Sequence, residues 1–191
     1  VGEEGYTTNA TSSVIEIKAP AEIGLLYGGV SVVQSFTADG FFPCGSAVDY
    51  PAYPVRSGMI DVGRAWIPLE YVEEISRYMV WFKMNEIHLH INDEGSNGYS
   101  AFRLESDMVG ENGQKLTANG LFFTKKEFRE LIDYAKERGV NIVPEFDTPG
   151  HALSFTRVRP DLIYQGEMKH KDRRCEMLDA ANPKTLDFMG K

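Results

Sequence analysis

Residues 56–93 read RSGMIDVGRAWIPLEYVEEISRYMVWFKMNEIHLHIND, in which a strand pattern, a helix pattern and a second strand pattern follow one another. Residues 58–62 are a short apolar run that is typical of a buried strand. Pro68 suits the first turn of a helix, and apolar residues then recur every three or four positions as far as Phe82. Residues 86–91 form the second strand pattern, so this stretch predicts a strand–helix–strand unit.

The same alternation continues towards the C-terminus. Thr124 and Glu127 form a capping box before a helical face that ends at Gly139, and residues 140–144 are the next strand. Strands that alternate with helices at this spacing predict an α/β fold with a parallel sheet. A closed barrel of this kind needs roughly 250 residues, more than this chain contains. We therefore expect a partial (β/α)8 barrel, with about the first three strand–helix units.

The first 54 residues follow a different pattern. The polar start at residues 1–13 is typical of a linker, and residues 14–17 alternate like a short strand. Residues 23–36 are apolar and glycine-rich, with helical spacing. Three prolines interrupt residues 37–54, which we expect to form a loop.

Composition excludes several classes of protein. A hydrophobic content of 42% and a charged content of 25% are typical of a folded globular chain. The net charge of −8 argues against a nucleic-acid surface. No stretch approaches the roughly 20 apolar residues of a membrane span, and the N-terminus lacks the pattern of a signal peptide. The two cysteines, Cys44 and Cys175, could pair or stay reduced.

Ionisable side chains gather in the C-terminal part of each predicted barrel strand and in the loop that follows, where the catalytic residues of such barrels lie. In chain order these side chains are Asp61, Arg64, His88, His90, Asp93, Glu94, Glu145, Asp147 and His151. Without further information, Asp61 and Arg64 are best interpreted as a structural ion pair. The last three could equally form an ordinary capped turn, because Asp before Thr-Pro is common turn chemistry.

Four motifs make the chain resemble glycoside hydrolase family 20: YPVRSGMIDVGR (53–64), KMNEIHLHINDEG (83–95), NIVPEFDTPGH (141–151) and LDAANPKTLDF (178–188). Each motif is weak alone, but they occur in the family's order and at comparable spacing. The segment AEIGLLYGGVSVVQSF (21–36) resembles the last helix of the small α+β domain that precedes the family's barrel. The resemblance implies that residues 1–40 are a linker and the tail of that domain, and that residues 41–191 begin the catalytic barrel.

The resemblance also implies roles for individual residues. Asp93 and His151 match a hydrogen-bonded relay that orients the catalytic glutamate and tunes its pKa. Arg56 matches the arginine that binds hydroxyl groups of the terminal sugar. We expect His90, Glu145 and Asp147 to complete the sugar-binding side of the site.

The family removes terminal β-linked N-acetylglucosamine or N-acetylgalactosamine from glycans by substrate-assisted, retaining catalysis, and the resemblance implies no metal and no cofactor. Its Asp-Glu pair, which orients the acetamido group and protonates the leaving oxygen, follows the fourth barrel strand. The helix opened by Asn182 and Pro183 stops at residue 191, so we expect the natural chain to continue. We expect this chain to lack the general acid and to be inactive alone. The family implies an extracellular, cell-surface or lysosomal setting.

The sequence departs from the family at residues 95–99, which read GSNGY where the family commonly has Gln-Gly-Trp-Arg. This departure puts the contacts around the sugar, and therefore the substrate preference, in doubt.

Two alternative functions deserve comparison. A partial barrel could serve as a carbohydrate-binding or non-catalytic module, and its unpaired strand edges predict self-association. His88 and His90 share one face of a strand and could bind zinc in a barrel hydrolase. Zinc would need further ligands, and the remaining histidines are His151 and His170, the latter in a basic loop. We favour hydrogen-bonded histidines in the barrel interior.

Overall fold

The computed structural model describes residues 2–94, 100–118, 120–167 and 176–190. The chain divides into two compact units. The first unit comprises Val1–Gly58, Glu73–Glu86 and Tyr134–Asn141. The second comprises Met59–Val72, Ile87–Asp133 and Ile142–Lys191. Cys175 and His170 lie outside the described residues, as do residues 95–99, where the sequence departs from the family motif.

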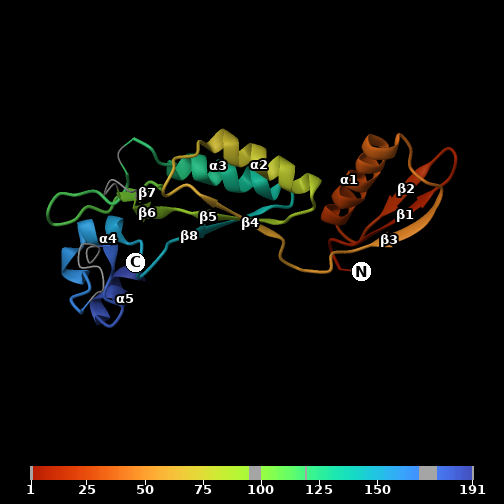
Figure 1. Cartoon of the computed structure of the whole chain (residues 1–191). Coiled ribbons are helices and arrows are strands. Elements are labelled where there is room, and N and C mark those ends of the chain that lie inside the picture. The colour runs from red at the N-terminus through yellow and green to blue at the C-terminus, as the bar shows by residue number, and fades with distance from the viewer. Residues whose placement is uncertain (1, 95–99, 119, 168–175, 191) are drawn as a thin grey trace. The chain divides into compact units, whose positions relative to one another are not determined.

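A small antiparallel sheet forms the centre of the first unit (Figure 1). Its strand order is β2-β1-β3, with β1 at Tyr6–Ala10, β2 at Ile15–Lys18 and β3 at Gly45–Asp49. Helix α1, Glu22–Asp39, packs against β1 and β2. The strand at 15–18 and the helix at 22–39 agree with the periodicity of the sequence.

Two glycines allow α1 to approach this sheet closely. A Cβ atom on Gly24 would overlap the carbonyl oxygen of Gly5, which is backbone and cannot yield easily. A Cβ atom on Gly28 would lie 2.5 Å from Cγ2 of Ile17. The glycine-rich composition of this helix therefore reflects close packing against the sheet.

The first unit corrects two expectations from the sequence. Residues 6–10 form a strand where a linker was expected, and residues 45–49 form a strand where a loop was expected. All five residues of β3 are exposed, so no alternation between apolar and polar residues marks this strand in the sequence. Pairing with β1, from Tyr6 opposite Asp49 to Ala10 opposite Gly45, supplies the order instead. The small sheet therefore extends past residue 40, the boundary expected for the small domain.

The predicted strand–helix alternation is present. Strand β4 (Ser57–Asp61) leads through α2 (Leu69–Trp81) to β5 (Glu86–His90), and α3 (Lys125–Lys136) leads on to β8 (Asn141–Glu145). The three strands form a sheet with the order β4-β5-β8. They run parallel, because backbone hydrogen bonds join Asn85 to Arg56 at one end and Val62 to His90 at the other.

The predicted signals at the ends of α3 are confirmed. The backbone nitrogen of Thr124 donates to Oε2 of Glu127 at 2.8 Å, and the nitrogen of Glu127 donates to Oγ1 of Thr124 at 3.1 Å. This reciprocal arrangement is a capping box. Gly139 has a φ of 70°, a left-handed conformation that a glycine adopts without strain.

The rest of the second unit lies around the long loop and the C-terminal segment. Strand β6 (Asn92–Glu94) pairs antiparallel with β7 (Ser100–Phe102). Helix α4 (Leu153–Val158) packs against both strands, and a 3-10 turn (Pro160–Leu162) follows it. Helix α5 (Pro183–Met189) begins as expected, because Oδ1 of Asn182 accepts a hydrogen bond from the nitrogen of Lys184.

Burial separates the two faces of the parallel sheet. Ile87 and Leu89 of β5 are fully buried, whereas Met59 of β4 is 62% exposed and Val143 of β8 is 39% exposed. Other buried apolar side chains of the second unit include Val62, Val72, Ile91, Phe102, Phe123, Phe128, Leu131, Phe155, Leu162 and Leu178. Among the described residues, no helix combines the length and apolar character that crossing a membrane requires.

Candidate functional site

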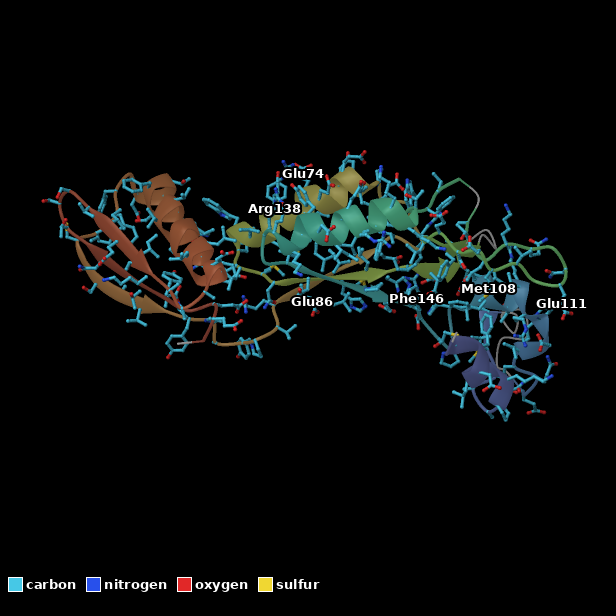
Figure 2. All side chains as sticks on the ribbon, turned by 180° about the vertical axis from the view of Figure 1, so that it is seen from behind. Glu74, Glu86, Met108, Glu111, Arg138 and Phe146 are labelled. Carbon is cyan, nitrogen blue, oxygen red and sulfur yellow. The ribbon has the colours of Figure 1, made fainter. Side chains whose placement is uncertain are left out.

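The candidate site lies in the second unit, where β4, β5 and β8 end. Asp61, His90 and Glu145 are the last residues of these three strands. The carboxyl ends of parallel strands meet at one edge of a sheet, so residues far apart in sequence come together there. Figure 2 labels Phe146, which follows β8 directly and stacks on Phe102 with 5.6 Å between the ring centroids. This aromatic contact anchors the loop that leads from β8 into the site.

His90 lies at the centre of the site and is buried. Its Nδ1 is 2.9 Å from Oε1 of Glu145, and its Nε2 is 2.6 Å from Oδ2 of Asp93. The other carboxylate oxygen of Glu145 contacts Nε2 of His88. Both histidines of the His-x-His motif therefore face one acid, as their shared strand face predicted.

The surroundings of His90 favour its protonated form. Burial alone lowers the pKa of an imidazole, but hydrogen bonds to Asp93 and Glu145 outweigh it and raise the pKa of His90 above its usual value. A charged His90 can donate from both ring nitrogens, one to each carboxylate. The imidazolium is thereby neutralised by the two acids that it joins.

Asp93 is the most connected side chain of the site and is only 1% exposed. Its Oδ2 lies 2.6 Å from Nε2 of His90 and 2.7 Å from NH2 of Arg64. Its Oδ1 lies 3.0 Å from Nδ1 of His151 and accepts the backbone nitrogen of Glu94 at 2.7 Å. Each oxygen thus faces two donors, so the hydrogen-bonding capacity of both carboxylate oxygens is used.

Arg64 connects Asp93 to Asp61. Its NH1 lies 2.7 Å from Oδ2 of Asp61, and its backbone nitrogen donates to Oδ1 at 2.9 Å. Burial tends to raise the pKa of Asp61, but these hydrogen bonds from Arg64 more than offset it and lower the pKa. The ion pair expected between the two residues is present. Arg64 also reaches Asp93, which the sequence did not predict, and its side chain remains 49% exposed.

His151 presents its ring at the edge of the site. Its Nδ1 is 3.0 Å from both Oδ1 of Asp93 and Oε1 of Glu94, and its side chain is 41% exposed. The backbone of His151 has a φ of 50°, which is uncommon for a residue other than glycine. Asn92 fixes this backbone, because its Nδ2 donates to the carbonyl oxygen of His151 at 3.0 Å. Backbone and ring are therefore both held, the pattern of a residue placed for function.

Asp147 contributes through its backbone. Its nitrogen donates to Oδ1 of Asn92 at 2.9 Å, and its carbonyl oxygen accepts Nδ2 of Asn92 at 3.1 Å. The side chain of Asn92, which is fully buried, thereby ties the turn after β8 to the strand after β5. Asn92 was not singled out in the sequence, although it stands two residues after the His-x-His motif.

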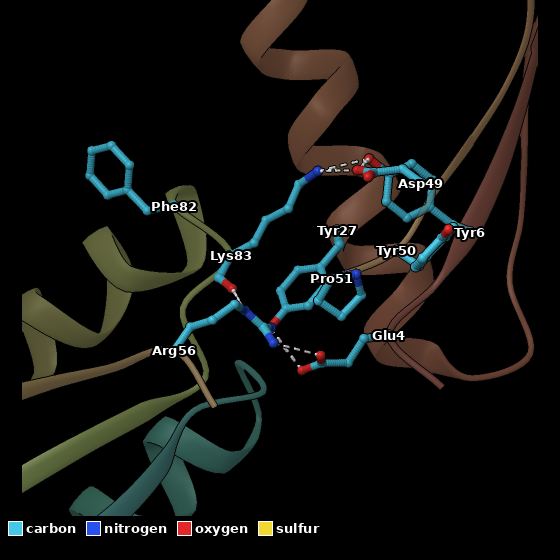
Figure 3. A pocket seen from close by; sticks show the side chains of 9 residues that line it. All are labelled: Glu4, Tyr6, Tyr27, Asp49, Tyr50, Pro51, Arg56, Phe82 and Lys83. Atoms are coloured by element: carbon cyan, nitrogen blue, oxygen red, sulfur yellow. Dashed lines mark hydrogen bonds and ion pairs between the residues drawn. The ribbon is translucent and has the colours of Figure 1, made fainter. Parts of the chain in front are cut away.

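Arg56, the expected sugar-binding arginine, lies in the first unit (Figure 3). Its guanidinium donates to both carboxylate oxygens of Glu4 at 2.9 Å, to the hydroxyl of Tyr27 at 3.2 Å and to the carbonyl of Lys83 at 2.7 Å. It lines a cavity of about 150 Å³ together with these residues and the rings of Tyr6, Tyr50 and Phe82. These contacts occupy the guanidinium, so binding of a sugar by Arg56 stays a prediction.

Three sets of site residues bring possible metal ligands within 4.8 Å of one another. These sets are Asp61, His90 and Asp93; His90, Glu145 and Asp147; and Asp93, Glu94 and His151. A metal requires a neutral imidazole with a free ring nitrogen. Both nitrogens of His90 already face carboxylates, and its pKa is raised. The two sets that contain His90 are therefore better suited to an ion-paired network than to zinc.

Arg103, in the long loop, is a further residue that the sequence did not single out. It is 2% exposed, and its guanidinium donates to the carbonyls of Val62 and Gly63 at 2.9 and 3.0 Å. These two residues directly precede Arg64. Arg103 thereby supports the backbone that carries the exposed arginine of the site. A lone arginine in a loop gives no signal of this role in a single sequence.

Comparison with known families yields one match over most of the chain. Residues 53–191 match the model described as glycosyl hydrolase family 20, catalytic domain. A beta-hexosaminidase from Vibrio furnissii is 26% identical over 98% of this chain and 34% of its own length. A beta-hexosaminidase from Akkermansia muciniphila is 32% identical over 84% of this chain and 34% of its own length.

A solved structure gives the same picture. The chitobiase of Flavobacterium johnsoniae superposes with a TM-score of 0.79 at 28% identity, covering 97% of this chain and 28% of that one. The chain therefore spans about a third of the length of the curated relatives that it matches.

Proposed function

Because the chain belongs to glycosyl hydrolase family 20, we propose that it forms part of an enzyme that hydrolyses terminal β-linked N-acetylglucosamine or N-acetylgalactosamine from glycans. The observation that carries this proposal is the connected set around Asp93, in which one buried carboxylate joins His90, Arg64 and His151. All four residues come from the strand ends where barrel enzymes place their chemistry.

Asp93 and His151 act as a relay in this proposal. Nδ1 of His151 faces acceptors, so the ring donates from this nitrogen, and in its neutral form it then carries its lone pair on Nε2. With 41% of the side chain exposed, Nε2 is available to a neighbouring group. A relay of this kind orients a carboxylic acid and helps set its pKa, as a proton donor near neutral pH requires.

We place the proton donor itself outside these residues. In the family, the acetamido oxygen of the substrate attacks the anomeric carbon, while a glutamate after the fourth strand protonates the leaving oxygen. Of the consecutive acids, Asp93 is buried and Glu94 is 10% exposed, and they lie beside His90 and His151. The motif that contains them is that of the family's second barrel strand. The isolated chain is therefore expected to bind part of the terminal sugar and to be inactive.

Arg64 is a second arginine that can contact the sugar. It follows β4 at the strand end that carries the acids, and half of its side chain remains exposed. Asp61 and Asp93 hold one side of the guanidinium, which leaves its other N–H groups to donate to hydroxyl oxygens. We propose that Arg64 also donates to sugar hydroxyls, and the hydroxyl-binding role implied for Arg56 stays a prediction.

The family also suggests where the protein is located. We propose an extracellular, cell-surface or lysosomal setting, in which terminal N-acetylhexosamines of glycans are available.

Strands β4 and β8 are the two edges of their sheet in the described part of the chain, and unpaired strand edges favour pairing with another chain. The isolated chain should therefore self-associate, and a strictly monomeric species in light scattering would contradict this.

The test is the release of nitrophenol from a nitrophenyl β-N-acetylglucosaminide, by this chain and by the full-length protein that contains it. Cleavage by the full-length protein alone supports both the activity and the external proton donor. Cleavage by the 191-residue chain would place the acid among its own carboxylates and refute the mechanism. If neither protein cleaves, the hydrolase proposal fails, and binding of N-acetylglucosamine becomes the measurement for a carbohydrate-binding module.

A further inference from the structure

Glu94 is a buried acid at the site that the proposed relay does not use. Its side chain is 10% exposed, and it follows Asp93 in strand β6. Its Oε1 lies 3.0 Å from Nδ1 of His151, the nitrogen that also faces Asp93. Its Oε2 is buried and has no hydrogen-bond partner in the part of the chain that the structure describes.

The unequal partners of its two oxygens indicate which form of Glu94 suits this position. A buried carboxylate that leaves one oxygen without a donor is costly, whereas a neutral carboxyl group carries its own proton on that oxygen. Oε1 then remains a carbonyl oxygen that accepts the N–H of His151. Asp93 differs from Glu94 in this respect, because both of its oxygens receive donors.

The charges around Glu94 point in the same direction. Burial is the largest influence that raises the pKa of Glu94, and the negative charge of Asp93 adds to it. The charge of Glu176 also raises this pKa, whereas His151 lowers it. Helix α4 packs against β6, and its buried polar residues Ser154 and Thr156 carry no charge that could neutralise a carboxylate.

We propose that Glu94 is a positioning residue for His151, a neutral carboxyl group that fixes the proton on Nδ1 and leaves Nε2 free to accept. Without a charge on Glu94, His151 faces one ionised partner, Asp93, whose charge is already shared with His90 and Arg64. A second ionised partner would favour an imidazolium, which has no lone pair on Nε2. Glu94 thus orients the ring while leaving it able to accept. This inference rests on the proposed hydrolase function.

Two variants of the full-length protein separate orientation from charge. Glu94→Gln keeps a neutral acceptor at Oε1, so kcat and the pH profile of kcat/KM should remain close to those of the wild type. Glu94→Ala removes the acceptor, and kcat should fall by about tenfold or more with little change in KM, part of the roughly 10²–10⁴-fold that a positioned acid–base group supplies. Glu105→Gln and Glu105→Ala are matched controls, because Glu105 accepts from the nitrogen of Lys125 on an exposed part of the same unit.

Nitrogen NMR of the His151 ring distinguishes this role from a general effect on folding. The wild type and Glu94→Gln should show the tautomer protonated at Nδ1, and Glu94→Ala should show a mixture. A limb of the pH profile that moves by about one unit in Glu94→Gln would mean that Glu94 is ionised, and the proposal would be wrong. An unchanged ring tautomer in Glu94→Ala would also overturn it. If the wild type cleaves no substrate, the hydrolase proposal fails, while the NMR measurement still decides the role of Glu94.

Discussion

Replacing Asp93 by asparagine tests whether one carboxylate holds the site together. The four groups that surround Asp93 are all donors, two on each oxygen. Asparagine keeps one oxygen but turns the other into an amino group, which would face two donors instead of accepting them. The change is nearly isosteric, so packing is preserved while two hydrogen bonds and the negative charge are lost.

The expected loss of stability follows from these contacts. Hydrogen bonds that involve a charged group contribute about 1.5–3 kcal/mol each, so losing two of them costs about 3–6 kcal/mol. Breaking one side of a buried ion pair typically costs about 3–5 kcal/mol, which agrees with that range. We therefore expect Asp93→Asn to lower the free energy of unfolding by about 3–5 kcal/mol at pH 7.

Urea unfolding followed by tryptophan fluorescence measures this loss. Trp66 lies in the same unit and contacts Phe123, with 4.7 Å between ring centroids. In a Trp81→Phe background, Trp66 is the sole tryptophan and reports unfolding of this unit. Asp61→Asn is the matched control: Asp61 is partly exposed and pairs with a half-exposed arginine, so it should cost about 1 kcal/mol or less. A loss for Asp93→Asn no larger than that of the control would refute the reasoning.

Three further predictions concern pH, the helix cap and sugar binding. The pKa of His90 is raised in the folded state, so its contribution to stability is complete below the unfolded value of about 6.5 and is lost as the pH rises through the folded pKa. Urea unfolding at a series of pH values should show this loss of stability, and His90→Gln should abolish it. Thr124→Ala should lower the free energy of unfolding by about 1 kcal/mol, while Thr124→Ser, which keeps the capping oxygen, should lower it less; equal losses would contradict the cap. In the full-length protein, Arg64→Ala should raise KM about tenfold or more, because it removes charged hydrogen bonds to hydroxyls. A KM that stays near the wild-type value would contradict a sugar-binding role of Arg64.

The sequence determined the barrel part of the fold because its signals are local. Apolar periodicity, the capping box at Thr124 and the glycine at 139 each depend on neighbours in the chain, and all three appear where they were expected. The small sheet was missed in part for the opposite reason. Strand β3 is exposed on both faces and is specified by its partner β1, about forty residues away, so its own residues carry no pattern.

The sequence also pointed to residues of this candidate site, because the family motifs place Asp93, His90 and His151 at or after the ends of predicted strands. Only the tertiary structure decided which atoms meet. It joins His90 to Glu145, 55 residues away, and shares Nδ1 of His151 between Asp93 and Glu94.

The two arginines of the first motif, Arg56 and Arg64, also show what the sequence gives and what only the structure adds. Both fit a sugar-binding role by residue type, and spacing alone does not distinguish them. Arg56 precedes β4 and pairs with Glu4, whereas Arg64 follows β4 and joins the acids. The role of a charged side chain depends on the partners that folding brings to it, and a motif gives the residue types but not those partners.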